Sequence, residues 1–494
     1  MAVSISCGGS VLYLRAALAK SDAFYGNGLP ALPPIFRVKC EAMAQAVSSS
    51  QRDLDLQHLW HGNMQHRGLE ARPPLEIAGA DGCYVVDADG RRYLDGMAGL
   101  FCVNVGYGRR EIVDAVTAQM AQLAYYPLTQ SHGPAAQLAA RVAEMLPRGL
   151  SRVFFSNSGS EAVETALKMA RQCARRMHPG QNRYKVIARH RGYHGFTMGA
   201  ASATGQSPRK IAFEPLVPGF LHVAPPDHYR CSFCSSQLAC TLTCADEIER
   251  VIRMEGPETV AAVIAEPVIG GGGIFPAPEG YLERLRAICD RHGVLLIIDE
   301  VITGFGRTGK LFGFEHAGIR PDILTFAKGL TSAYLPLGAT VASEEIFEAF
   351  YGDPESDAKF TQVSTFGGHP SCCAAGLANL DILMRERLWE NSASTGAYLL
   401  EKLRAISSRW IGEIRGRGLL IGLELVADAN KTPLPEARMV QLLRTMREAG
   451  VLAGRNNDTV PGYCNVLILS PPLIFSPDQA DTIALVIQDA LAKL

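Results

Sequence analysis

The pattern of hydrophobic and polar positions changes at about residue 50. From about Leu54 onward, apolar residues recur at the spacings of helices and strands, whereas residues 1–50 are rich in Gly, Pro, Ser and Ala and poor in acids. Residues 82–87 and 91–95 flank Asp89-Gly90, which favours a tight turn, and together they predict a β-hairpin. We expect residues 1–50 to form a poorly ordered extension.

The middle of the chain predicts an α/β fold. Between about residues 150 and 345, short runs rich in β-branched residues alternate with stretches of helical periodicity, which is typical of a parallel sheet covered by helices. After about residue 370, a helical run, a strand-like run and a terminal helix predict a second, smaller α+β unit. The strands of the sheet are expected at residues 152–155, 185–188, 260–265, 294–299 and 323–326.

Composition and charge exclude several classes of partner. The 494 residues hold 48 Lys and Arg against 49 Asp and Glu, so nothing indicates binding to nucleic acid. The longest apolar runs are far shorter than the roughly 20 residues that a membrane-spanning helix needs. Small neutral or zwitterionic substrates fit this balance better.

The 13 cysteines and the start of the chain bear on its compartment. An odd cysteine count without a secretory signal favours a reducing, cytoplasmic setting. A basic organelle-targeting peptide within residues 1–50 is the alternative, although Gly28, Pro30 and Pro33 would interrupt its helix.

An acid and a lysine carry the strongest chemical signal. Asp299 ends the apolar run at residues 295–298, and Lys328 follows the strand expected at residues 323–326. Open α/β sheets bind ligands at the carboxyl ends of their strands. A lysine that forms an imine and a carboxylate that charges a pyridine nitrogen suit a pyridoxal cofactor. These two residues alone leave a structural ion pair as the alternative.

A third signal lies between a strand and a helix. Ser158, Gly159 and Ser160, followed by Glu161, stand where a helix begins, and free N–H groups at a helix start bind phosphate. Taken alone, however, these residues are explained better by ordinary N-capping of the helix.

Five motifs follow one another along the chain: Ser158-Gly159-Ser160-Glu161-Ala162, Gly192-Tyr193-His194-Gly195, Glu266-Pro267, the run from Asp299 to Gly309, and Lys328-Gly329. Taken in this order, they resemble those of the class III (ω-amino acid) aminotransferases. The resemblance implies a fold type I transferase that binds pyridoxal 5′-phosphate, with a mainly parallel seven-stranded large domain and a smaller α+β domain. It also implies a homodimer, or a dimer of dimers, with active sites at the interface.

The resemblance also divides the chain. It implies an N-terminal part of the small domain at residues 51–95, a large cofactor-binding domain at residues 96–370 and a C-terminal small domain at residues 371–494, after the extension at residues 1–50.

Roles at the cofactor follow from the same resemblance. Lys328 would hold the cofactor as a Schiff base and transfer the proton in catalysis, and Asp299 would pair with the pyridine nitrogen. Val301 and Tyr193 would lie against opposite faces of the ring. His194 and Glu266 would complete the cofactor pocket. The phosphate would be bound by Ser158, Gly159 and Ser160, joined by Thr365 of the other subunit.

Substrate residues are implied in the same way. Arg415 matches the arginine that clamps a substrate carboxylate, and Phe101 would line the pocket for the distal group. Relatives that use ornithine or 4-aminobutyrate carry an acid that gates this arginine, where this chain has Gly271. An arginine without that gate suits an amine donor, either an ω-amino acid or an amine, and pyruvate as the keto-acid acceptor. Among possible donors, β-alanine, taurine, diamines and arylalkylamines stay open.

Other functions also stay open. The same lysine and acid serve 4-aminobutyrate or diamine transaminases that use 2-oxoglutarate, and aminomutases, decarboxylases and racemases. A non-catalytic protein with this fold is a further alternative. Aminotransferases require no metal, but four cysteines within a short stretch could bind zinc, or could form a reduced loop. These are Cys231, Cys234, Cys240 and Cys244.

Overall fold

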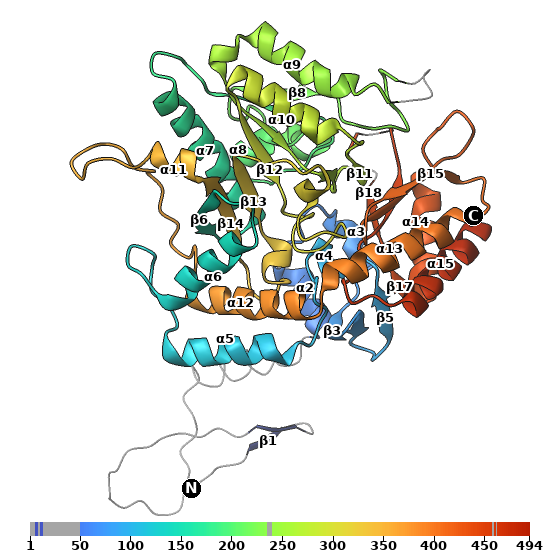
Figure 1. The fold of residues 1–494 in the computed structure, drawn as a ribbon. Coiled ribbons are helices and arrows are strands. Elements are labelled where there is room, and N and C mark those ends of the chain that lie inside the picture. The colour runs from blue at the N-terminus through green and yellow to red at the C-terminus, as the bar shows by residue number, and fades with distance from the viewer. Residues whose placement is uncertain (1–4, 8–9, 13–49, 235–239, 457–458, 461) are drawn as a thin grey trace, which may run out of the picture. The chain divides into compact units, whose positions relative to one another are not determined.

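The computed structural model describes residues 5–7, 10–12, 50–234, 240–456, 459–460 and 462–494 (Figure 1). The prediction for residues 1–50 therefore falls almost wholly outside the described residues.

The chain divides into two compact units, residues 1–76 and 77–494. In the first unit, Ser50 and Asp53 form a capping box that starts helix α2. The elements of this unit are β1 (Ile5–Cys7), β2 (Ser10–Leu12), α2 (Gln51–His58) and α3 (His66–Ala71).

A seven-stranded sheet forms the centre of the second unit. Its order is β6-β14-β13-β12-β9-β7-β8, and only β14 runs antiparallel to its neighbours. The predicted α/β fold with a mainly parallel sheet is confirmed, and all five expected strands are present. The strands are β6 (Leu150–Ser156), β7 (Lys185–Arg189), β8 (Phe220–Val223), β9 (Val260–Ala265), β12 (Leu295–Asp299), β13 (Ile323–Phe326) and β14 (Gly338–Ser343).

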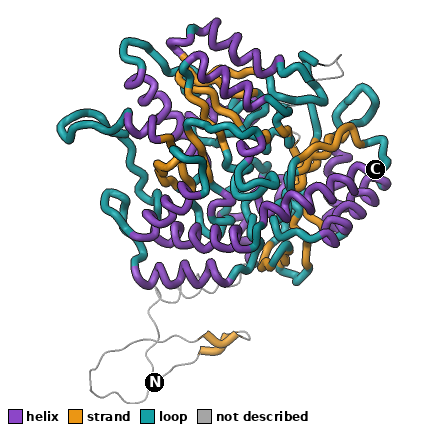
Figure 2. The backbone as a smooth tube through the Cα atoms, in the orientation of Figure 1, coloured by secondary structure: helices purple, strands orange, loops and turns teal. Residues whose placement is uncertain are grey.

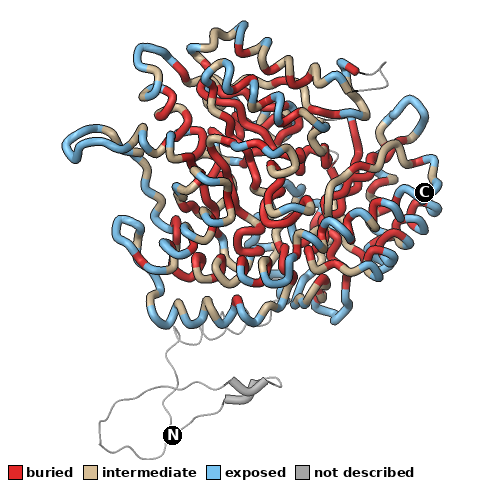
Figure 3. The backbone as a smooth tube through the Cα atoms, viewed as in Figure 1, coloured by how far each residue is buried: buried red, intermediate tan, exposed pale blue. Residues whose placement is uncertain are grey.

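Both faces of this sheet are buried, because side chains alternate across each strand. On β12, Leu296 and Ile298 pack in one core cluster with residues of α10 (Tyr281–His292), and Ile297 packs in another with residues of α7 (Gly159–Met177). Figure 2 shows helices flanking the strands, and in Figure 3 the buried residues follow the strands. Each such buried Leu or Ile stabilises the fold by about 1.5–3 kcal/mol.

Two four-stranded sheets lie outside the central one. The antiparallel sheet β15-β16-β19-β18 comes from the last part of the chain, whereas β17-β5-β4-β3 combines strands from both ends of the second unit. The hairpin predicted around Asp89-Gly90 is confirmed as β4 and β5. The strands are β3 (Ile77–Asp81), β4 (Tyr84–Asp87), β5 (Arg92–Asp95), β15 (Ile411–Gly416), β16 (Ile421–Leu425), β17 (Val451–Leu452), β18 (Gly454–Asn456) and β19 (Val466–Leu469).

The remaining elements connect these sheets. Within the described residues, no helix is long and apolar enough to cross a membrane. The remaining elements are β10 (Val268–Ile269), β11 (Phe275–Pro276), α4 (Ala98–Phe101), α5 (Arg110–Gln122), α6 (Gly133–Glu144), α8 (Met198–Ala203), α9 (Thr243–Glu255), α11 (Glu344–Glu348), α12 (Pro370–Arg385), α13 (Leu388–Arg404), α14 (Glu436–Glu448), α15 (Pro477–Ala492) and the 3-10 helices η1 (Ser207–Arg209), η2 (Ile211–Phe213), η3 (Pro257–Thr259), η4 (Gly313–His316) and η5 (Lys328–Leu330).

Candidate active site

A buried carboxylate marks the carboxyl edge of the central sheet. Asp299, the last residue of β12, is 3% exposed. Its Oδ2 lies 2.7 Å from Nδ1 of His194, and its Oδ1 accepts hydrogen bonds from the Thr325 hydroxyl (3.0 Å) and the Val301 N–H (3.1 Å). Thr325 lies opposite Asp299 because β12 and β13 pair in parallel register. The carboxylate is therefore fixed in position.

Lys328 follows β13 at the same edge and opens the 3-10 helix η5. Its φ of 42° lies in the left-handed region, which is strained for a side-chain-bearing residue. Its Nζ lies 5.2 Å from the centre of the Phe101 ring. Burial lowers the pKa of the Lys328 amine below its ordinary 10.5, while Cys102, Asp299 and Glu266 act in the opposite direction. Burial thus favours the neutral amine more than water does.

The start of α7 lies at the end of β6, on the same edge. The Ser158 hydroxyl caps the helix by accepting the Glu161 N–H (3.2 Å), so the capping interpretation is correct for this residue. The N–H groups of Gly159 and Ser160 belong to the first turn, where no intrahelical carbonyl can accept them. They and the positive end of a 19-residue helix can still bind a phosphate.

Gly195 brings the loop after β7 against this helix start. Its φ is 131°, and an added Cβ would lie 2.5 Å from Oγ of Ser160. Only glycine permits this approach, which lets the Phe196 N–H donate to the Ser160 hydroxyl (3.1 Å).

Two further predicted residues lie beside Asp299. Glu266 is buried, and burial raises its pKa. Its carboxylate accepts the N–H groups of Tyr193 (3.0 Å) and Gly270 (2.9 Å), and so positions Tyr193. Val301 packs on the start of α7, since a Cβ on Gly159 would lie 2.8 Å from its Cγ1.

Arg415, on β15, differs from its expectation. Its guanidinium lies over the Phe275 ring at 3.9 Å and pairs with Glu413 (2.5 Å) and Glu424 (2.7 Å). Gly271 leaves the expected gating position without an acid, but Arg415 is not free of carboxylates in this conformation, because it pairs with Glu413 on β15 and Glu424 on β16.

Thr365 lies in the exposed loop before α12. Its carbonyl accepts the Tyr125 hydroxyl (2.7 Å), and it lines a cavity of about 400 Å³ together with Asn157 and Glu161 at the start of α7. Its expected contribution to a second subunit stays a prediction.

Sequence reasoning missed four residues that hold the site together: Thr325, Glu413, Glu424 and Arg230. For three of them the signal was strand pairing, since β15 and β16 place Glu413 opposite Glu424, as β12 and β13 place Asp299 opposite Thr325. Arg230 carried no signal, because its partner Glu424 is 194 residues away.

The four clustered cysteines are free thiols: Cys231, Cys234, Cys240 and Cys244. Within the part of the chain that the structure describes, no group of three or more His, Cys, Asp or Glu residues is placed to hold a metal ion.

The residues at the sheet edge fit pyridoxal phosphate. A lysine with a lowered pKa suits the aldehyde, a fixed carboxylate suits the pyridine nitrogen, and a helix start suits the phosphate. These three groups meet where β6, β12 and β13 end.

Known proteins resemble the whole second unit. The sequence matches the family described as "Aminotransferase class-III" over residues 67–491. It is 49% identical to the uncharacterized aminotransferase YhxA of Bacillus subtilis over 89% of this chain and 96% of that protein. It is 42% identical to the taurine–pyruvate aminotransferase of Bilophila wadsworthia, with the same two coverages.

Comparison with solved structures leads to the same family. An amine transaminase from an uncultivated Pseudomonas species, described as PLP-bound, superposes with a TM-score of 0.83 at 39% identity, covering 88% of this chain and 99% of that one. The fold is that of the fold type I transferases. The chain therefore belongs to the class III aminotransferases, enzymes that depend on pyridoxal 5′-phosphate.

Proposed function

We propose that this enzyme transfers an amino group from an ω-amino acid or amine to pyruvate, as ω-amine, β-alanine and taurine aminotransferases do. The observation that carries the proposal is Arg415, a buried cation held by two carboxylates. An arginine that exchanges these partners for a substrate carboxylate would let one pocket accept a keto acid and a donor without an α-carboxylate. The likeness to a taurine–pyruvate aminotransferase supports the same substrate class.

In this proposal, Lys328 would hold the cofactor covalently, Asp299 would face its pyridine nitrogen, and Val301 and Tyr193 would enclose its ring. Ser158, Gly159 and Ser160 would bind its phosphate, and His194 and Glu266 would support the pocket from behind. When bound, pyridoxal phosphate draws electrons from the substrate carbon next to the transferred nitrogen, which acidifies that carbon.

Lys328 would move the proton. Burial lowers its pKa, which favours the neutral form of the amine, and that form could take a proton from one carbon and return it to another as a general acid and base. Asp299 would stabilise the positive charge that makes the cofactor an electron acceptor, and its three hydrogen-bond partners fix it before the reaction begins.

The active enzyme would be a homodimer, or a dimer of dimers. Thr365 would reach the phosphate site of the partner subunit from its exposed loop. Phe101, beside Lys328, would contact the distal group of the amine. Both partners in the reaction would be small molecules: an amine donor and a keto-acid acceptor.

A spectral titration tests the proposal. Purified enzyme is mixed with a panel of amines, including taurine, β-alanine, diamines and arylalkylamines, and then with pyruvate or 2-oxoglutarate. We expect the absorbance of the bound cofactor to change with the amine and to recover with pyruvate. Recovery with 2-oxoglutarate alone would favour a 4-aminobutyrate or diamine transaminase. A cofactor that never responds would instead favour an aminomutase or a decarboxylase.

A further inference from the structure

Arg415 is fully engaged in the conformation described. Nη1 donates to Glu413 and Glu424, and Nε and Nη2 donate to the carbonyls of Gly273 (3.1 and 2.7 Å) and Ile274 (2.8 Å). All three nitrogens are used, so binding a substrate carboxylate requires some of these contacts to break. Arg415 is therefore stored: its guanidinium is held by protein groups and is not free to bind a substrate carboxylate.

Glu424 is shared by two arginines. It lies on β16 with 0% exposure, and its two oxygens accept hydrogen bonds from different residues: Oε1 from Nε of Arg230 (2.5 Å) and Oε2 from Nη1 of Arg415 (2.7 Å). A buried carboxylate without a partner is strongly unfavourable. When Arg415 leaves, Arg230 is the residue that still neutralises Glu424.

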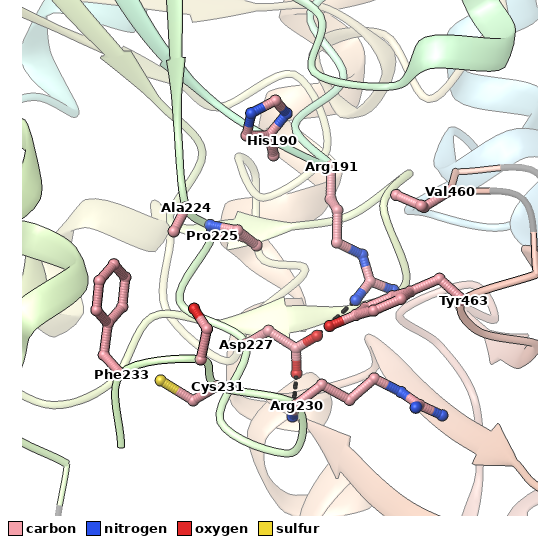
Figure 4. A pocket seen from close by; sticks show the side chains of 11 residues that line it. His190, Arg191, Ala224, Pro225, Asp227, Arg230, Cys231, Phe233, Val460 and Tyr463 are labelled. Carbon is pink, nitrogen blue, oxygen red and sulfur yellow. Dashed lines mark hydrogen bonds and ion pairs between the residues drawn. The ribbon is translucent and has the colours of Figure 1, made fainter. Parts of the chain in front are cut away.

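Arg230 cannot follow Arg415, because other contacts hold it. Its Nη2 donates to the carbonyl of Lys431 (2.6 Å), and its N–H donates to the Asp227 carboxylate (3.1 Å). Figure 4 shows Asp227 between Arg230 and Arg191, with Tyr463 beside both arginines. These residues line a cavity of about 170 Å³. Arg230 is thus a fixed counter-charge.

Glu413 differs from Glu424 in its surroundings. Its side chain is 22% exposed, so water can solvate it when Arg415 departs. It stabilises only the stored position of Arg415 and needs no second arginine.

We propose that Glu424 and Arg230 are positioning residues that store Arg415 and permit its release to a substrate carboxylate. This inference rests on the proposed function, because it explains how one pocket alternates between a keto acid and a donor without an α-carboxylate. It assigns opposite effects to two residues: Arg230 favours release of Arg415, and Glu413 opposes it.

Calorimetric titration with propanoate, a carboxylate that cannot react, tests the storage of Arg415 without turnover. In the cofactor-loaded enzyme, Arg230→Gln leaves Glu424 dependent on Arg415 and should weaken propanoate binding about tenfold. Glu413→Gln should tighten it by a similar factor. Arg444→Gln, at an exposed arginine of α14, is the control and should change nothing. Arg230→Lys keeps the charge and should remain close to the wild type.

A double-mutant cycle separates this storage from a general field effect. In an Arg415→Ala background, both shifts should disappear, because they act through Arg415. Shifts that persist there, or that have the same sign in both variants, would overturn the inference. Failure of this inference can be told apart from failure of the proposed function. If the wild type transfers amino groups from amines to pyruvate but the variants show no such shifts in propanoate binding, only the storage role is refuted. Opposite shifts in an enzyme that transfers no amino group would leave storage intact and refute the function.

Discussion

Asp299 and Lys328 could be identified from the sequence because Asp299 ends one buried strand and Lys328 follows another, and the chain direction of a parallel sheet then brings them to one edge. Their supporting contacts could not be identified that way. The hydrogen bond from Thr325 depends on the register of β12 against β13, and that from His194 depends on how a loop folds over 105 residues of separation. The residue types indicated the chemistry of the site, whereas the hydrogen bonds that orient Asp299 depend on strand register and loop folding.

The pKa of Lys328 should be measurable directly. Burial lowers it, and the neutral fraction of an amine rises as pH passes its pKa, so acetylation of Lys328 by acetic anhydride should reach half its maximum below pH 10.5. Lys402 is the internal comparison, because hydrogen bonds with Tyr398 and Asp481 raise its pKa above that value. Mass spectrometry of the labelled peptides in cofactor-free protein gives both curves. The reverse order would contradict the role given to burial.

Asp299→Asn should keep the shape of the site and remove its charge. We expect turnover to fall by about 10²–10³, the usual effect of losing one preorganised electrostatic group. Thr325→Val removes one hydrogen bond and keeps the carboxylate, so it should cost only about tenfold. Steady-state turnover with the best amine and pyruvate compares the two. Full activity in Asp299→Asn would refute its assignment.

At the scale of elements, the sequence predicted strands whose side chains are large and β-branched. It did not single out β14, whose Gly-Ala-Thr-Val-Ala-Ser has small residues and no alternation, or β8, a short edge strand in which only Val223 is buried. Helix α7, whose start the sequence indicated, continues to Met177, because its buried apolar face extends to Ala174. Tertiary packing, rather than the conformational preference of the local sequence, determined these strands and the extent of this helix.

Gly195→Ala should separate steric fit from backbone strain. Gly180 also has a positive φ (83°), but an added Cβ there meets nothing within 4 Å. Gly180→Ala should therefore lower the free energy of unfolding by about 1 kcal/mol, from strain alone. Gly195→Ala should lower it by about 3 kcal/mol or more, because its Cβ also collides with Ser160. Urea unfolding of both variants measures the difference, and equal losses would contradict the close approach.

At the scale of the molecule, local patterns already suggested a pyridoxal cofactor, whereas the expectation of a dimer came from the resemblance alone. The domain boundaries near residues 50, 95 and 370 stay a proposal. Exposed apolar side chains surround Thr365, and we call them the Thr365 patch. It comprises Tyr125, Leu128, Val363 and Phe366, which are 37, 42, 76 and 59% exposed. Such a patch is consistent with the subunit interface proposed above.

Charges in the Thr365 patch should split the dimer. The double variant Val363→Asp, Phe366→Asp should sediment as a monomer and bind cofactor more weakly, because the partner's Thr365 would no longer reach the phosphate site. Met254→Asp, an equally exposed apolar position on α9, is the control. Sedimentation equilibrium measures the mass, and a double variant that remains dimeric would place the interface elsewhere.

The pairing of β5 with β17 links the two ends of the second unit and has a consequence for biosynthesis. Arg91 donates to the carbonyl of Arg447, 356 residues later, and β5 gains its parallel neighbour only from Val451 and Leu452. A growing chain on the ribosome therefore exposes an unpaired strand edge for most of its translation. Such edges template association with other chains. Truncated products that end before residue 451 should accumulate as aggregates, whereas full-length chains close this edge by themselves.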